Sequence, residues 1–265
     1  MRISAGSWTS GSGAPYGRPM AHGTAPDDDV RQRGRAGADR LAVGLGLVSA
    51  GLVGLSLLTR WLAYRREVAA PGIAPPPWLA LFDVNSEVNV PTWFSVALLV
   101  VTGAVALAVA GLHRPAAPRV ARFLGVLGLA LFALSLDELT SLHERLGALG
   151  ATVAGSAVHF TWVVPGLLVA GVLVAALVHG LASLDRASRG PFAVAAAVFF
   201  TGALVLEAVS GQVLVVAGDR AAYLLVTAAE ELCEMAGVVL LLRAVTRLVR
   251  VSPDAGGWRL APAAG

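Results

Sequence analysis

Six long apolar runs dominate the chain, separated by shorter polar segments that carry most of its arginines. Each run approaches or exceeds the roughly 20 residues that a helix needs to cross a bilayer, and none alternates apolar and polar residues as an outer-membrane strand does. The pattern predicts an all-α polytopic membrane protein, a bundle of about six transmembrane helices. The expected spans are residues 41–64, 91–112, 120–142, 157–181, 191–216 and 221–246.

The two ends of the chain differ from these runs in composition. Residues 1–40 are rich in Gly, Ser, Pro and Ala and lack the apolar core of a signal peptide, so we expect a disordered cytoplasmic tail. A six-helix transmembrane domain then covers residues 41–250. Residues 251–265 are expected to form a second, short disordered tail.

Composition supports a membrane location. The 265 residues are 56% hydrophobic and only 14% charged, which is far more apolar than a soluble domain. All 20 basic residues are arginines, and they lie beside the ends of apolar runs and not in a patch with interleaved aromatic residues. We therefore expect the lipid bilayer as partner and no nucleic acid. The single cysteine, Cys233, excludes a disulfide within the chain.

Arginine placement predicts the orientation. In a six-span protein, most arginines near the span ends fall on the side of the two termini, and few fall on the other side. Cytoplasmic segments of membrane proteins are enriched in basic residues. We therefore expect both termini in the cytoplasm and a multi-pass protein of the cell (inner or plasma) membrane.

Acidic and histidine side chains gather in the outer halves of the predicted spans. An ionisable group deep in a bilayer costs at least ~2.5 kcal/mol on insertion scales and usually belongs to a site. We therefore predict one polar pocket, with Asp83 and Glu87 contributed by the outer loop. The other candidates are Asp137, Glu138, His143 and Glu144 in the third span, His159 in the fourth, Glu207 in the fifth, and Glu230, Glu231 and Glu234 in the sixth.

Helical spacing suggests which of these side chains point the same way. Asp137, Ser141 and Glu144 are four and then three residues apart and share a face of a continuous helix. Glu230 and Glu234 share another face by the same spacing. Two interpretations without a functional site stay open. His143 and Glu144 could form a solvated helix end, and the deep acids could make ordinary interhelical hydrogen bonds.

Three glutamates within five residues of the sixth span need compensation for their charge, because like charges at close range destabilise one another's ionised forms. No arginine is expected at their depth, which leaves protons, a cation or the histidines. A divalent metal ion is a candidate cofactor, with oxygen ligands favouring magnesium, calcium or manganese. Its candidate ligands are Asp137, His159, Glu207, Glu230 and Glu234.

Two motifs resemble those of an uncharacterised family of multi-pass bacterial membrane proteins. The first is F-D-x-x-x-E-x-N-x-P-T-W-F-S, which begins at Phe82, and the second is D-E-x-x-x-x-H-E, which begins at Asp137. The resemblance covers about residues 80 to 240 and implies a membrane-embedded helical fold without implying an activity.

The sequence leaves several functions open. The favoured one is binding or transport of a cation, a proton or a cationic solute through the outward-facing acidic site. An alternative is an intramembrane metal-dependent hydrolase with a lipid-like substrate, in which His143 and His159 with Asp137 or Glu138 hold the metal. The chain has few histidines for such a centre and no His-Glu-x-x-His motif. A structural partner without chemistry is the third possibility.

Overall fold

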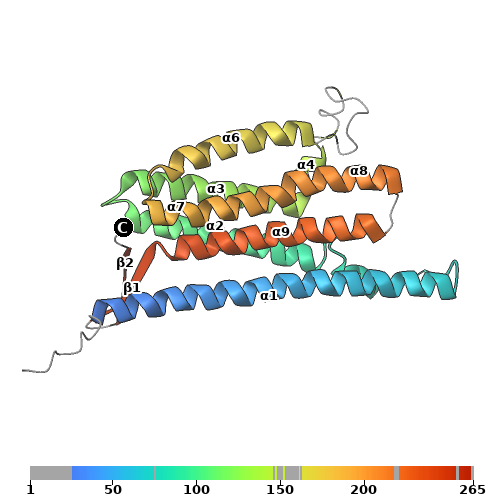
Figure 1. Cartoon of the computed structure of the whole chain (residues 1–265), viewed down its shortest axis with the longest axis horizontal. Coiled ribbons are helices and arrows are strands. Elements are labelled where there is room, and N and C mark those ends of the chain that lie inside the picture. Colours follow the sequence, from blue (N-terminus) through green and yellow to red (C-terminus); the bar gives the residue numbers. More distant parts are fainter. Residues whose placement is uncertain are drawn as a thin grey trace, which may run out of the picture.

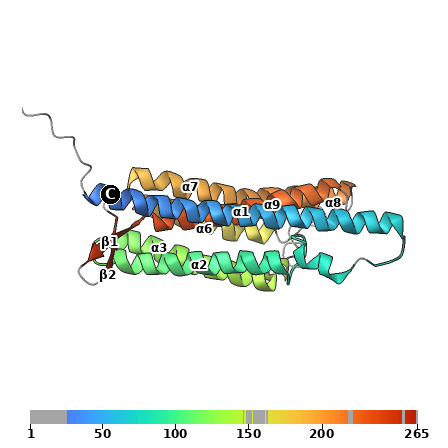
Figure 2. The same ribbon diagram turned by 90° about the horizontal axis from the view of Figure 1, so that it is seen from below.

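The structure is a computed structural model that describes residues 26–74, 76–145, 147, 152, 161, 163–217, 221–254 and 257–263. These residues are mostly helical, and the long helices lie side by side along one axis (Figures 1 and 2). The long helices are α1 (Pro26–Ala69), α2 (Val90–His113), α3 (Pro118–Thr140), α6 (Val163–Leu181), α7 (Arg186–Phe200) and α9 (Ala221–Thr246).

Shorter elements connect or extend these helices. A π-helix, η2 (Thr201–Leu206), joins α7 to α8 (Glu207–Ala217), and a 3-10 helix, η1 (Pro77–Phe82), follows α1. The four-residue helix α4 (Leu142–Arg145) comes directly after α3. Figure 1 shows α4, α8 and the start of α9 at one end of the bundle, opposite the C-terminal strands.

Helix α9 is the centre of the bundle, because it packs against α1, α2, α7, η2 and α8. Its inward side chains Met235 and Val245 are almost fully buried, as is Leu124 of α3. A Cβ atom at Gly237 of α9 would lie 2.7 Å from the backbone of Phe199. The absence of a side chain at Gly237 therefore lets α7 and α9 approach closely.

Within the described residues, four helical segments are long and apolar enough to cross a membrane, and α6 is a shorter apolar helix. Leu168 and Val172 of α6 are more than 70% exposed on the protein surface, as side chains facing lipid would be. The protein is therefore a multi-pass membrane protein of helical type. The four segments are Gly34–Ala69, Val90–His113, Pro118–Thr140 and Arg186–Val216.

The start of the chain differs from the sequence-based expectation. Helix α1 begins at Pro26, so residues 26–40 are helical and not part of a disordered tail. Asp39 explains part of this order, because its carboxylate accepts hydrogen bonds of 2.7 Å from Arg243 Nε and from Arg247 Nη2. These contacts join the beginning of α1 to the end of α9.

The end of the chain also differs from the expected disorder. Strands β1 (Val249–Asp254) and β2 (Gly257–Pro262) pair antiparallel after α9. The backbone carbonyl of Leu248 accepts a hydrogen bond of 2.8 Å from Ala263 N and lies 3.1 Å from Nε2 of the buried His113. The hairpin is therefore attached to the end of α2.

Candidate functional site

A cavity of about 770 Å³ lies between the 84–87 loop, α3, η2, α8 and α9. Among the described residues that line it, acidic side chains are present and Arg and His are not. The acidic residues on its wall are Glu87, Asp137, Glu138, Glu207, Glu230, Glu231 and Glu234. The structure thus brings acids from the loop and from three predicted spans to one cavity.

Two of these acids, from α8 and α9, lie next to each other. The carboxyl groups of Glu230 and of Glu207, the first residue of α8, lie within hydrogen-bond reach of each other. A hydrogen bond between two carboxyl groups requires an O–H donor, so such a pair can form one only when it holds a proton. Glu230 lies nine residues after the start of α9, which places it about 14 Å from that helix end.

Two buried polar atoms on the cavity wall lack a hydrogen-bond partner within the described part of the chain. They are Oε2 of Glu230 and Oγ1 of Thr227, and both residues are only 6% exposed. Buried polar groups are nearly always paired with protein, ordered water or a ligand. Since both atoms belong to residues that line the cavity, they indicate where a water or a bound ligand would be held.

The local sequence explains how Glu207 reaches Glu230. The wider turn of a π-helix changes the direction of the following side chains, and such turns are frequent at functional sites. Gly202 in η2 is buried, and a Cβ atom there would lie 2.7 Å from the carbonyl oxygen of Glu230 and from Cγ of Glu234. Glycine at this position lets η2 contact the acidic turn of α9.

The outer loop is held by its own polar side chains. Asp83 is 5% exposed and pairs with Arg60 of α1 at 3.2 Å, while its carboxylate accepts hydrogen bonds from Asn85 N and Ser86 Oγ. Asn89 caps α2 by accepting a hydrogen bond of 3.1 Å from Thr92 N. Asp83 therefore organises the loop, and Glu87 is the loop acid on the cavity wall.

Tyr223 connects this loop to α9. Its hydroxyl donates a hydrogen bond of 2.8 Å to Oδ1 of Asn85, and both residues line the cavity. Neither was among the predicted site residues. The spacing of Tyr223, Thr227, Glu230 and Glu234 by four, three and four residues was a helical signal that would have found Tyr223. No comparable signal marks Asn85.

The second motif adopts a different backbone from the one predicted. Helix α3 ends at Thr140, and Ser141 takes a left-handed conformation with φ of 49° before α4 begins. The predicted shared face of Asp137, Ser141 and Glu144 is therefore wrong, because it needs an unbroken helix. The side chains of His143 and Glu144, like the whole of His159, lie outside the described residues.

The described acids do not form a compact metal centre. Among the described residues, no three His, Cys, Asp or Glu side chains are placed to hold a metal ion. Of the proposed metal ligands, Asp137, Glu207, Glu230 and Glu234 do share the cavity wall. The acids are thus spread over a wide wall of the cavity.

The fold and the cavity define a multi-pass helical membrane protein with a carboxyl-lined internal site. The chain belongs to the family defined by a domain of unknown function, DUF8692, whose model matches residues 41–248. No curated protein and no solved structure matches the chain. The family match covers every element that lines the cavity, from the 84–87 loop to α9.

Proposed function

We propose that this membrane protein binds a cation in its acidic cavity and releases a proton from the Glu207–Glu230 pair as it does so. This exchange is the chemistry of a proton-coupled cation transporter. The observation that carries the proposal is a buried unpaired oxygen on Glu230, whose carboxyl lies beside that of Glu207 at the wall of a cavity lined by further acids.

Proton and cation compete at the pair because each compensates the same negative charge. A unit positive charge about 4 Å from a carboxylate contributes about 4 kcal/mol at an effective dielectric constant of 20. That free energy changes a protonation equilibrium by about three powers of ten. A cation beside Glu230 therefore favours release of the shared proton, and loss of the cation restores it.

The neighbouring residues fit these roles. Glu231 and Glu234 place two further carboxyl groups on the cavity wall beside the pair, and a carboxyl group that is ionised there favours entry of a cation. Thr227 lines the cavity one turn before Glu230, and its hydroxyl oxygen is a neutral acceptor for a cation or its water. The proton leaves through the same cavity to water, so charge stays balanced within the membrane.

We also propose the arrangement of this site in the membrane. The protein has six spans, with α6 and α9 added to the four most apolar segments, and both termini face the cytoplasm. Arg114, Arg119, Arg186 and Arg247 support this orientation, because all four belong to helix ends at the side of the C-terminal strands (Figure 1). The acidic cavity then lies towards the outer side.

Proton release on cation binding tests this function. Full-length protein in lipid nanodiscs is placed in weakly buffered solution with a pH-sensitive dye, and sodium chloride or tetramethylammonium chloride is added. We expect about one proton released per protein by the wild type with at least one of these cations, and none by Glu230→Gln.

Glu67→Gln is the matched control, because Glu67 is exposed on α1 and does not line the cavity. This variant should release protons as the wild type does. Equal release by the wild type and Glu230→Gln, or no release by the wild type with either cation, contradicts the proposed function.

A further inference from the structure

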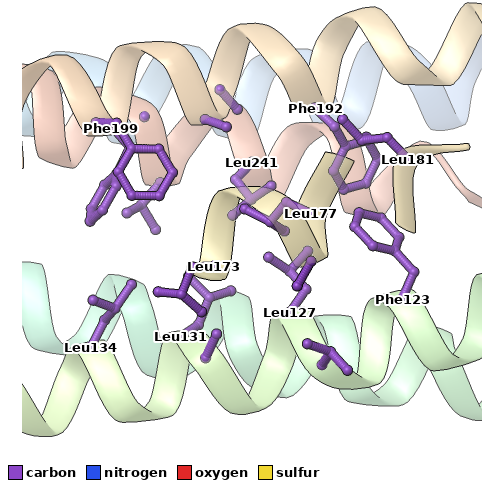
Figure 3. A pocket seen from close by; sticks show the side chains of 18 residues that line it. Phe123, Leu127, Leu131, Leu134, Leu173, Leu177, Leu181, Phe192, Phe199 and Leu241 are labelled. Carbon is purple, nitrogen blue, oxygen red and sulfur yellow. The ribbon is translucent and has the colours of Figure 1, made fainter. Parts of the chain in front are cut away.

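A second, apolar pocket lies beside the acidic cavity, between α3, α6, α7 and α9 (Figure 3). It has a volume of about 70 Å³, and all of the side chains that line it are apolar. At its far end, the rings of Phe123 and Phe192 meet edge to face with centroids 5.5 Å apart. Figure 3 shows these two rings pointing toward each other from α3 and α7.

The two spaces share a wall. The residues that line both are Ala130, Leu134, Leu173, Phe199, Phe200 and Val238. Val238 follows Glu234 by one helical turn, and Leu134 precedes Glu138 by one turn, so acidic and apolar surfaces succeed each other along the same faces of α9 and α3. The apolar pocket therefore borders directly on the acidic cavity.

The size of the acidic cavity and the aromatic residues on its wall indicate which kind of ligand fits. A cavity of about 770 Å³ is roughly 25 times the volume of one water molecule in the liquid, so it admits an organic cation. Phe199, Phe200 and Tyr223 line its wall, and aromatic side chains are what sites for quaternary ammonium groups use. The neighbouring pocket is small, and the pair of Phe123 and Phe192 limits its length.

We propose that the cation is an organic ammonium ion with a short apolar group. Its charged nitrogen lies against Glu230 and Glu234, and its apolar group enters the pocket between α3, α6 and α7. This inference rests on the proposed function for the acidic cavity, and adds the substrate class to it. Two features match such a molecule. The buried unpaired carboxyl oxygen of Glu230 suits its charged nitrogen, and the apolar pocket suits its apolar group.

Chain-length dependence of binding tests the inference. Affinities of tetramethylammonium and butyltrimethylammonium are measured by calorimetry on the full-length protein in nanodiscs, with 1-butanol as an uncharged probe. Burying one methylene group contributes about fourfold in affinity. We expect butyltrimethylammonium to bind at least tenfold more tightly than tetramethylammonium, and 1-butanol to bind weakly and without proton release.

Two variants locate the apolar group. Ala196 lines the apolar pocket but not the acidic cavity, so Ala196→Leu should fill the pocket and remove the advantage of the butyl chain. Ala197→Leu is the matched control, because Ala197 is exposed and outside the pocket. Leu177→Ala enlarges the pocket and should let hexyltrimethylammonium bind more tightly than the butyl compound, which keeps the test decisive if Ala196→Leu does not fold.

The outcomes separate the two proposals. Equal affinities of tetramethylammonium and butyltrimethylammonium for the wild type, with proton release intact, contradict the organic-ammonium inference and leave the proton-coupled cation site standing. Proton release that is unchanged in Glu230→Gln contradicts the proposed function itself. A butyl advantage that survives in Ala196→Leu and does not extend to hexyl in Leu177→Ala also overturns the assignment of the pocket.

Discussion

The carboxyl groups of Glu207 and Glu230 lie within hydrogen-bond reach of each other, although the two residues belong to different helices, α8 and α9. Gly202 in η2, five residues before Glu207, leaves room for the close approach of this segment to α9. A buried carboxyl pair of this kind holds a proton more readily than two ionised groups. The backbone of η2 therefore sets the chemistry of the cavity.

The first prediction concerns Gly202. A methyl group from Gly202→Ala would meet the backbone and side chain of α9 at 2.7 Å and push η2 away from Glu230. Overpacking of this kind costs about 1–3 kcal/mol. We expect a lower thermal unfolding temperature and loss of cation-driven proton release, measured on the same preparation.

Gly125→Ala is the control for this substitution. Gly125 is also helical, and a Cβ atom at that position meets nothing within 4 Å. Its replacement should leave stability unchanged or slightly higher, because alanine favours a helix. If Gly202→Ala behaves like Gly125→Ala, the close contact between η2 and α9 is not required for the site.

The second prediction concerns the loop above the cavity. Tyr223→Phe removes the hydrogen bond of 2.8 Å to Asn85 and leaves the Asn85 side chain without that donor. Such a loss costs about 1 kcal/mol. We expect faster proteolysis within the 84–87 loop and a small decrease in thermal stability. Tyr64→Phe, at a side chain that is 67% exposed, should change neither.

The third prediction concerns topology. Single cysteines are introduced at Ile73, in the exposed segment after α1, and at Ala187, exposed near the start of α7, in a Cys233→Ala background. In intact cells, a membrane-impermeant maleimide should label the cysteine at 73 only. Labelling at 187 should require opened cells. Equal accessibility of both positions in intact cells contradicts the six-span arrangement.

The fourth prediction concerns pH and the start of α7. The pKa of Asp185 lies below its ordinary value because its carboxylate accepts hydrogen bonds from the hydroxyl and the backbone N–H of Ser188. A lowered folded-state pKa gives stability that is present above the unfolded value of about 3.9 and is lost as pH falls through the folded-state value.

Asp185→Asn isolates this contribution. Asparagine still caps a helix, but it cannot offer a carboxylate to Ser188. The variant should be less stable than the wild type at pH 7, and the difference should shrink as the pH is lowered below about 3.9. A difference that is constant between pH 7 and pH 3 contradicts this account of the cap.

The sequence predicted the helical class and the long apolar segments of a membrane protein, because both follow from local spacing and hydropathy. It did not predict the break at Ser141, since a left-handed serine has no strong local signal. The role of Asp83 also depended on a distant residue, Arg60 of α1. Tertiary contacts, and not local pattern, decide such positions.

The ordered structure near the chain ends also depends on tertiary contacts that local sequence does not reveal. Residues 26–40 look disordered by composition, yet Asp39 pairs with Arg243 and Arg247 across the bundle. The pairing of η2 with α9 depends on a π-helix, which arises from packing and has no simple sequence pattern. The identity of the acids was therefore visible in the sequence, and their pairing was not.

The proton shared by Glu207 and Glu230 is the central claim, and infrared difference spectroscopy measures it most directly. Spectra of the full-length protein in nanodiscs at neutral pH should contain a carbonyl stretching band of a protonated, buried carboxyl group. The band should shift in deuterium oxide, disappear in Glu230→Gln, and decrease when the cavity is loaded with butyltrimethylammonium. A spectrum without this band at neutral pH, or a band that persists unchanged in both Glu230→Gln and Glu207→Gln, would contradict the account.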